Sequence, residues 1–383
     1  MKITTALNIL LSTGGALAKP QLFSRNATSD YPPASTPSNG TRYAIMDNDW
    51  TSIGFLPFLL ALGGGMKILG LASDTANTWV DQTTLHGLAL LERGNLSSCI
   101  PVVKGETYPL VQTYQRFQIY QQLWGSLEWQ GVFAPTNLTA QATGGDPTGS
   151  DPTQISRSAF TEGYPNTTAV PGVSAAQFMI DQVFKYPGQV SIYSAGALTN
   201  IATAIRLNSS FASTARELVI MGGYVDLNLY QLNSPLAQDI GSDINFLVDP
   251  EAAHIAVTAP FSSITIAGNV ANQQYLTQTQ LNTILNSSDN AYAQLMSNYF
   301  IELPLWDETA AAIMAYPELV TGSVEAYMDV NTAFDSPDLA RTHLWSKEFA
   351  PSHTRSVHYV TSVDQAGFFQ RVESVLAKPE TCP

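Results

Sequence analysis

Carboxylates and carboxamides recur in this sequence directly after short apolar runs. The residues are Asp47 and Asp49 after YAIM, Asp74 and Asn77 after KILGLA, Thr199 and Asn200 after QVSIYSA, Asp243 and Asn245 after the polar loop that follows ELVIMGG, and Asp307 before the helical pattern DETAAAIMA. Singly, each of them is typical of a helix cap or a turn. Together, converging carboxylates would repel one another, so a cation or a hydroxyl-rich ligand is their natural counterpart.

The apolar runs alternate with helical patterns, and this alternation predicts the scaffold. We expect strands at 43–47, 67–73, 101–103, 189–195, 217–223 and 263–268, and helices near 54–62, 80–91, 175–185, 198–206, from 250 onward, 277–300 and 308–315. Continuous apolar strands that alternate with helices predict an α/β fold, with a mostly parallel open sheet and helices on both faces. In such sheets ligands bind beyond the carboxyl ends of the strands, where the polar residues fall.

The composition excludes two classes of protein. Of the 383 residues, 31 are acidic and 17 are basic, which gives a formal charge of −14. A chain this acidic lacks the basic surface that neutralises phosphates, so we expect no nucleic-acid partner. With 45% hydrophobic residues, the chain is too apolar for intrinsic disorder and can bury a substantial core.

The N-terminus predicts secretion. Residues 1–18 contain Lys2, the apolar run 3–11 and the small-x-small sequence at 16–18, which together are typical of a signal peptide. The alternative is a membrane anchor, but this run is shorter than the roughly 20 residues that cross a bilayer, so we expect no membrane association. Residues 19–40 form a Pro- and Ser-rich leader that we expect to be disordered, and residues 41–383 are expected to form a single domain.

Sequons and cysteines point to the same compartment. Asn-x-Ser/Thr sequons, each of which marks a candidate glycosylation site, occur at Asn26, Asn39, Asn95, Asn137, Asn166, Asn208 and Asn286. In an oxidising compartment the two cysteines, Cys99 and Cys382, could form a disulfide that ties the C-terminal tail to the body of the protein. Two unpaired thiols are the alternative.

The segment DNDWT at 47–51 matches a short pattern that two families share in part. It fits the D-x-D-x-T motif of the haloacid-dehalogenase phosphotransferases, in which an Asp is the nucleophile and Mg²⁺ is bound. That site would also need a phosphate-binding Lys and a later acidic pair, and the sequence offers no convincing match for either. This family is therefore the weaker alternative.

Longer segments resemble the inosine-uridine-preferring nucleoside hydrolases, in the same order along the chain. They are LGLASDTANTWVDQTTLHGLALL, IPVVKG, VSIYSAGALTNIATAIRLNSSF, ELVIMGG, DINFLVDPEAAHIAV and LPLWDETAAAIMAYPELV. The acid-x-Asn pair Asp243 and Asn245 is the most specific piece, because such a pair contacts ribose in that family. The resemblance covers residues 41–320, and the DNDW variant is typical of secreted fungal members.

This resemblance implies a hydrolase that cleaves the N-glycosidic bond of nucleosides with a metal-activated water, and it implies Ca²⁺ at the strand ends. Carried over by position, Asp49 and Asp307 would be catalytic; Asp47, Asp49, Asp307 and the main-chain carbonyl of Thr199 would bind the metal; Asn77, Asp243 and Asn245 would hold the ribose; and Trp306 and Trp124 would contact the base. The family also implies a homo-oligomer as one state of assembly.

The sequence departs from the family at two places. The first motif, D-x-D-P-G-x-D-D, reads DNDWTSIG here, so two carboxylate positions fall on Ile53 and Gly54. We therefore expect weaker Ca²⁺ binding unless Asp47, Asp74 or Asp239 supplies the missing charge.

The second departure concerns the leaving group. The histidines that often serve it in the family correspond to Trp306 and Trp124 here. Without an imidazole, stacking on tryptophans, including Trp50, or Glu128 or solvent would have to assist departure of the base. Two functions remain open, namely an extracellular nucleoside hydrolase or a catalytically impaired, nucleoside-hydrolase-like binding protein.

Overall fold

The computed structural model describes residues 40–127, 129–225, 243–286 and 288–382. The expected signal peptide, almost all of the leader, and Asp239 and Glu128 lie outside these ranges. Within them the chain forms a nine-stranded sheet. The strands are β1 (Arg42–Asn48), β2 (Met66–Ser73), β3 (Val102–Lys104), β4 (Val190–Ser194), β5 (Glu217–Ile220), β6 (Ile264–Ile266), β7 (Val320–Val330), β8 (Thr342–Trp345) and β9 (Arg355–Val363).

The sheet is mostly parallel, as the sequence predicted. Its strand order is β3-β2-β1-β4-β5-β6-β9-β7-β8. Every neighbouring pair from β3 across to β9 is parallel, whereas β7 runs antiparallel to both β8 and β9. The antiparallel strands β7, β8 and β9 were not predicted, because their segments mix buried and exposed residues and lack a continuous apolar run.

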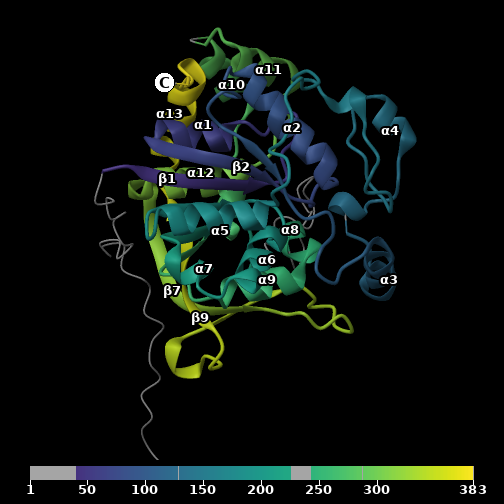
Figure 1. Cartoon of the computed structure of the whole chain (residues 1–383), viewed down its shortest axis with the longest axis vertical. Helices are drawn as coiled ribbons and strands as arrows, with labels where there is room; N and C mark the ends of the chain where they lie inside the picture. Colours follow the sequence, from purple (N-terminus) through teal and green to yellow (C-terminus); the bar gives the residue numbers. More distant parts are fainter. Residues whose placement is uncertain (1–39, 128, 226–242, 287, 383) are drawn as a thin grey trace, which may run out of the picture.

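Helices cover both faces of the sheet, which explains why the central strands are apolar throughout. They are α1 (Leu56–Gly63), α2 (Val80–Arg93), α3 (Tyr114–Trp124), α4 (Leu138–Ala142), α5 (Ala175–Lys185), α6 (Thr199–Leu207), α7 (Phe211–Thr214), α8 (Ile244–Val248), α9 (Pro250–Val257), α10 (Gln278–Leu285), α11 (Ala291–Tyr299), α12 (Trp306–Ala315) and α13 (Gln365–Ala377). Figure 1 shows α1 and α13 on one side of the strands and α5, α6 and α9 on the other.

Side chains alternate between these two layers along β1. Ala44 and Met46 pack into the core with α1, α12 and α13, whereas Tyr43 and Ile45 pack into the core with α5, α6 and α9. The central strands thus hold their carboxyl ends in fixed positions, and the polar residues that directly follow these ends are fixed in space as well. The predicted fold class is confirmed.

One predicted helix is wrong in extent. The pattern at 277–300 forms two helices, α10 and α11, instead of one. The side chain of Asn290 accepts hydrogen bonds from the amides of Tyr292 and Ala293, so it starts a new helix at that point. The helical pattern in the sequence is therefore continuous over this segment, although a cap at Asn290 divides the segment into two shorter helices.

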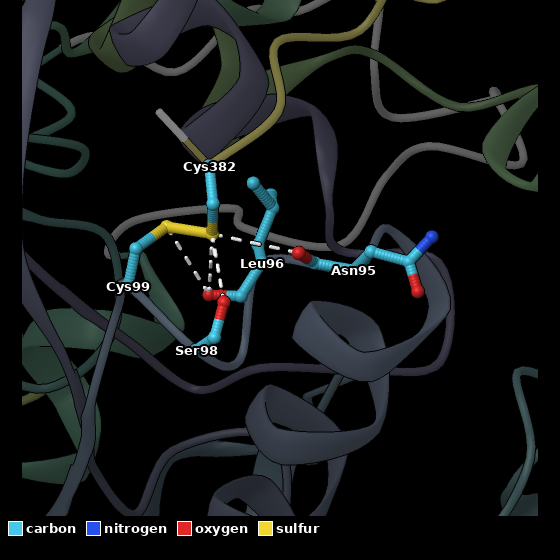
Figure 2. Close-up of a disulfide and its surroundings, with 5 residues drawn as sticks. All are labelled: Asn95, Leu96, Ser98, Cys99 and Cys382. Carbon is cyan, nitrogen blue, oxygen red and sulfur yellow. Dashed lines mark hydrogen bonds between the residues drawn. A yellow bond between two sulfur atoms is a disulfide. The ribbon is translucent and has the colours of Figure 1, made fainter.

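The two cysteines form a disulfide between Cys99, which follows α2, and Cys382, near the end of the chain. Figure 2 shows the bridge packed beside the main chain of Asn95 and Leu96. The predicted pairing is therefore present, and it joins α13 and the tail to the α2 side of the sheet. No helix in the described ranges has the length and apolarity needed to span a membrane.

Candidate active site

Asp47 lies at the carboxyl end of β1, buried between the ends of β2 and β4. Its Oδ1 accepts a hydrogen bond from Nδ2 of Asn200 at 2.8 Å, and the same amide nitrogen also donates to the carbonyl of Ser73 at 3.0 Å. The backbone amide of Glu106 donates to Asn200 Oδ1 at 2.8 Å. Asn200 thereby ties together the ends of three strands, while Oδ2 of Asp47 finds no hydrogen-bond partner among the described residues.

Asp49 follows Asp47 by two residues and faces the loop after β2. Its Oδ2 accepts a hydrogen bond from the backbone amide of Asn77 at 2.7 Å. Oδ1 of Asn77 in turn accepts one from the indole N–H of Trp129 at 3.0 Å. A predicted general base, a predicted ribose-binding residue and a tryptophan that the sequence did not single out therefore form one chain of contacts.

Asp307 reaches the same place from α12. Nδ2 of Asn48 donates to its Oδ2 at 3.2 Å, and the hydroxyl of Tyr193 on β4 donates to its main-chain carbonyl at 3.1 Å. These contacts fix the first turn of α12 against β1 and β4. The structure thus brings residues 47, 49 and 307 together, as the strand-end argument predicted.

Burial and mutual repulsion dominate the electrostatics of this cluster. Burial raises the pKa values of Asp47 and Asp307 to about 7. Burial, followed by the charge of Asp307 and then that of Asp47, raises the pKa of Asp49 well above its usual range, although the Asn77 amide opposes this shift. Nearby positive charge would favour the ionised forms, which a general base requires.

A cavity of about 270 Å³ opens beside the cluster. Polar lining residues come from strand ends and helix starts; they are Thr51, Asn77, Asp243, Asn245, Asp307 and Glu308. The apolar lining comes mainly from one segment, 296–306, together with Ile53, Met221 and Tyr224. The polar side chains can therefore hydrogen-bond a hydroxylated group, while the apolar ones offer a surface for an apolar or aromatic group.

Asp243 and Asn245 line the cavity, but parts of both side chains are already engaged. Asp243 caps α8 by accepting from the amide of Phe246 at 2.9 Å, and it also accepts from the amide of Gly223 at 2.7 Å. Nδ2 of Asn245 donates to the carbonyl of Met221 at 3.1 Å. These bonds fix the orientation of both residues toward the cavity wall.

Thr199 begins α6 beyond the end of β4, adjacent in sequence to Asn200. Its hydroxyl donates to Oδ2 of Asp249 at 2.7 Å, so the side chain is used within the scaffold. Asp47, Asp49 and Thr199 do not themselves line the cavity, whereas Asp307 lines it and also belongs to the carboxylate cluster.

The tryptophans are distributed differently from the sequence-based prediction. Trp306 lines the cavity, and its indole N–H donates to Asn272 Oδ1 at 2.6 Å. Trp124 is not among the cavity residues and lies 44% exposed on α3; Trp129 lines the cavity instead. Trp50 is fully buried in the core and donates to the carbonyl of Ala72, so it offers no stacking surface.

The donors of the cluster suit a hard cation. Buried oxygens without a hydrogen-bond partner include Asp47 Oδ2, Asn48 Oδ1 and both carboxylate oxygens of Asp74, and oxygen ligands of this kind are those that Ca²⁺ and Mg²⁺ prefer. Among the residues that the structure describes, no group of three or more His, Cys, Asp or Glu has the arrangement of a metal site. Main-chain carbonyls and water would have to complete the ligand set.

Comparisons with known proteins agree with this architecture. The family model described as inosine-uridine preferring nucleoside hydrolase matches residues 44–370. An uncharacterised protein of Schizosaccharomyces pombe is 34% identical over 86% of this chain and 83% of its own length. A probable uridine nucleosidase 1 of Oryza sativa subsp. japonica is 27% identical, over 67% of this chain and 71% of its own.

A solved structure shares the fold. The purine-preferring ribonucleoside hydrolase from Gardnerella vaginalis superposes with a TM-score of 0.65 at 20% identity, covering 88% of this chain and 99% of that one. The match of the family model spans the strands, the carboxylate cluster and the cavity described above. The chain therefore belongs to the inosine-uridine preferring nucleoside hydrolase family, whose members are metal-using hydrolases that act on N-glycosyl bonds.

Proposed function

We propose that this protein is an extracellular hydrolase that cleaves the N-glycosidic bond of nucleosides and releases ribose and a free base. The observation that carries the proposal is a buried carboxylate cluster beside a cavity that is lined by both polar and apolar side chains. Asp307 belongs to both, so a sugar in the cavity would lie next to the carboxylates.

The polar residues that line the cavity suit the ribose. Carboxamides and carboxylates bind vicinal hydroxyls well, because each hydroxyl both donates and accepts a hydrogen bond. Asn77, Asp243 and Asn245 are held by hydrogen bonds to the main chain or to Trp129, so little conformational entropy is lost when they bind a sugar.

The apolar residues that line the cavity suit the base. Trp306, Phe300 and Tyr224 provide aromatic surface, and Met221 and Met296 provide polarisable side chains that adapt to a flat ring. A nucleoside in the cavity would have its ribose against the polar residues and its base against the apolar ones, with the C1′ atom between them. That placement matches a reaction in which the base leaves from one side while ribose stays bound.

Asp49 would accept the proton of the attacking water. As the water oxygen bonds to C1′, the C1′–N bond breaks with its electron pair going to the base, and the water proton passes to the carboxylate of Asp49. The Asn77 amide orients that carboxylate by holding its Oδ2. The charge of Asp307 is close enough to raise the pKa of Asp49, so the two carboxylates belong to one electrostatic cluster.

A divalent cation, Ca²⁺ in our proposal, would be held by Asp47, Asp49, Asp307 and the main-chain carbonyl of Thr199. When bound it would offset the repulsion of these carboxylates and lower the pKa of the water. Its positive charge would also keep Asp49 ionised at neutral pH, which the raised pKa of that buried group otherwise opposes.

We also propose secretion and glycosylation. The support is the apolar N-terminal segment, the disulfide and the exposure of the sequons. Asn26 and Asn39 lie outside the described residues, and the other five asparagines, Asn95, Asn137, Asn166, Asn208 and Asn286, are exposed or partly exposed. Protein recovered from culture medium and treated with a glycosidase should lose mass and start after residue 18; a signal confined to cell extracts would contradict this.

The activity is tested by incubating the purified protein with purine and pyrimidine nucleosides, with Ca²⁺ and with a chelator, and measuring free ribose. We expect ribose release that depends on the cation. If no nucleoside yields ribose at high protein concentration, while one of them binds in a calorimeter, the protein would instead be the impaired binding protein that the two missing carboxylates also allow.

A further inference from the structure

Asp74 is a buried carboxylate to which the mechanism above assigns no role. It follows the last residue of β2 and is 1% exposed. Among the described residues neither of its carboxylate oxygens has a hydrogen-bond partner, although the nearby amide of Ala197 favours the ionised form. Leaving two such oxygens buried and unpaired is costly, so an interaction with another group is required to offset the cost.

Other buried carboxylates of this chain differ in this respect. Asp243 accepts hydrogen bonds from the amide of Gly223 in the loop after β5 and from that of Phe246 in α8. Asp249 accepts from Thr199, from the amide of Leu110 and from that of Ala252. Both therefore have the structural role of a cap. Asp74 accepts no such hydrogen bond within the part of the chain that the structure describes, so a capping role does not explain why a carboxylate is at this position.

The position of Asp74 directs it to the carboxylate cluster. β2 and β4 flank β1, and Asp74 lies against the loop after β4, where a Cβ added to Gly196 would come within 2.3 Å of its Oδ1. After burial, the charges of Asp47, Asp49 and Asp307 have the largest effects in raising the pKa of Asp74. The unpaired Oδ2 of Asp47 lies at the end of the neighbouring strand.

Protonation of Asp74 would not provide hydrogen-bond partners for both of its oxygens. A neutral carboxyl group has one O–H donor, but its second oxygen would still lack the hydrogen-bond donor that neither oxygen finds among the described residues. A cation would satisfy both oxygens and at the same time reduce the repulsion within the cluster. Gly196 keeps the space for this carboxylate open, because any larger residue would displace it.

We propose that Asp74 is a carboxylate ligand of the divalent cation and supplies negative charge that the family motif places at the positions of Ile53 and Gly54. This inference rests on the proposed cation-dependent function and names a ligand from a different strand. The metal would then have ligands at the ends of both β1 and β2, and one carboxylate gained after β2 would offset half of the negative charge lost after β1.

The test measures metal binding directly. Full-length protein freed of metal with a chelator is titrated with Ca²⁺ in a calorimeter, and its thermal unfolding is followed with and without Ca²⁺. For Asp74→Asn we expect Ca²⁺ affinity to fall at least about tenfold, and the metal-free protein to unfold at a higher temperature, because an unpaired buried carboxylate has been neutralised. Asp364→Asn, at the start of α13, is the control and should bind Ca²⁺ like the wild type.

A second variant keeps the carboxylate but moves it. Gly196→Ala places a methyl group against Asp74 Oδ1, so it should weaken Ca²⁺ binding when Asp74 is present and should add little in the Asp74→Asn background. This variant decides the question if Asp74→Asn does not fold. Unchanged Ca²⁺ affinity in both single variants, or a wild type that binds no divalent cation, would overturn the proposal.

Ribose release is measured on the same samples to separate the two proposals. If Asp74→Asn loses Ca²⁺ binding while even the wild type hydrolyses no nucleoside, Asp74 is a ligand and the proposed function fails. If the wild type hydrolyses nucleosides and both variants bind Ca²⁺ normally, the proposed function holds and the role of Asp74 fails.

Discussion

The backbone amide of Asn77 donates a hydrogen bond to Oδ2 of Asp49 at 2.7 Å. This bond joins the loop after β2 to the residue that follows β1, so the group proposed to hold ribose and the group proposed to accept a proton have a fixed separation. Such positioning matters because a hydrolytic water must be aligned with both the sugar carbon and the base.

Replacing Asp49 by Asn should nearly abolish turnover. The amide can still accept the hydrogen bond from Asn77, so the loop should keep its place, but the proton acceptor and one metal ligand are lost together. We expect kcat to fall by at least about a hundredfold, a typical contribution of a general base. Ribose release measured at saturating nucleoside checks this, with Asp364→Asn as the control; near-native kcat would show that another group is the base.

Asn200 should be among the residues on which stability depends most. It is fully buried, and its carboxamide makes hydrogen bonds with Asp47, Ser73 and Glu106. Asn200→Ala leaves these three partners unpaired, so we expect a loss of about 3 kcal/mol in the free energy of unfolding. Urea denaturation measures it, and Asn331→Ala, at a partly exposed loop position whose side chain accepts one hydrogen bond, should cost less than about 1 kcal/mol. Equal losses in the two variants would contradict the argument.

Trp129 lines the cavity, whereas Trp124 does not, so the two tryptophans form a matched pair for a test of substrate binding. Trp129→Phe keeps an aromatic ring but removes the N–H that holds Asn77, so we expect KM to rise several-fold with a smaller effect on kcat. Trp124→Phe is the matched control, because that ring does not line the cavity, and it should leave both constants unchanged. An increase in KM for Trp124→Phe alone would restore the original sequence-based assignment.

The carboxylate cluster could be predicted from the sequence because continuous apolar runs determine the strands. Parallel strands end at the same edge of a sheet, so residues 47, 49 and 74 had to lie together once those runs were identified. Helix α5 was also predicted at its observed limits, 175–185, since Ser174 provides a clear cap. These features depend on local patterns that a single sequence displays.

The cavity walls could not be predicted in the same way. Trp129 lies in a loop with no helical or strand period, and only its contact with Asn77 identifies it. The apolar residues from Met296 to Leu305 lie at the end of α11 and in the loop after it. In such a segment the sequence pattern does not indicate which side chains point into a cavity. Helix α3 ends between the two tryptophans, at Gly125, which has a positive φ of 109°.

The disulfide should contribute to stability more than to catalysis. Cys99 and Cys382 are 283 residues apart in sequence, so the bridge restricts a very long loop in the unfolded chain. We expect the double variant Cys99→Ser/Cys382→Ser to lose about 2–4 kcal/mol in the free energy of unfolding and to keep its kcat. Denaturation and ribose release of the same preparation check the two expectations. Loss of kcat without loss of stability would mean that the tail acts on the site.

Stability should also decrease with rising pH because of a buried histidine. His86 on α2 is fully buried, and its two ring nitrogens contact the carboxylates of Asp146 and Glu162. Burial alone would lower the pKa of His86, but the hydrogen bonds and charges of these two acids outweigh it and raise the pKa to about 9.

The sign follows from the two end states. In the unfolded chain His86 has a pKa of about 6.5, so below that pH both states are protonated and the full stabilisation is present. Between about pH 6.5 and 9 the folded state binds more protons, and stability is lost as pH rises, by up to roughly 3 kcal/mol. Urea denaturation at pH 6, 7.5 and 9 should show this decline in the wild type and a smaller one in His86→Gln. Parallel curves for the two proteins would mean that other groups cause the decline, because His86 is the group that the substitution removes.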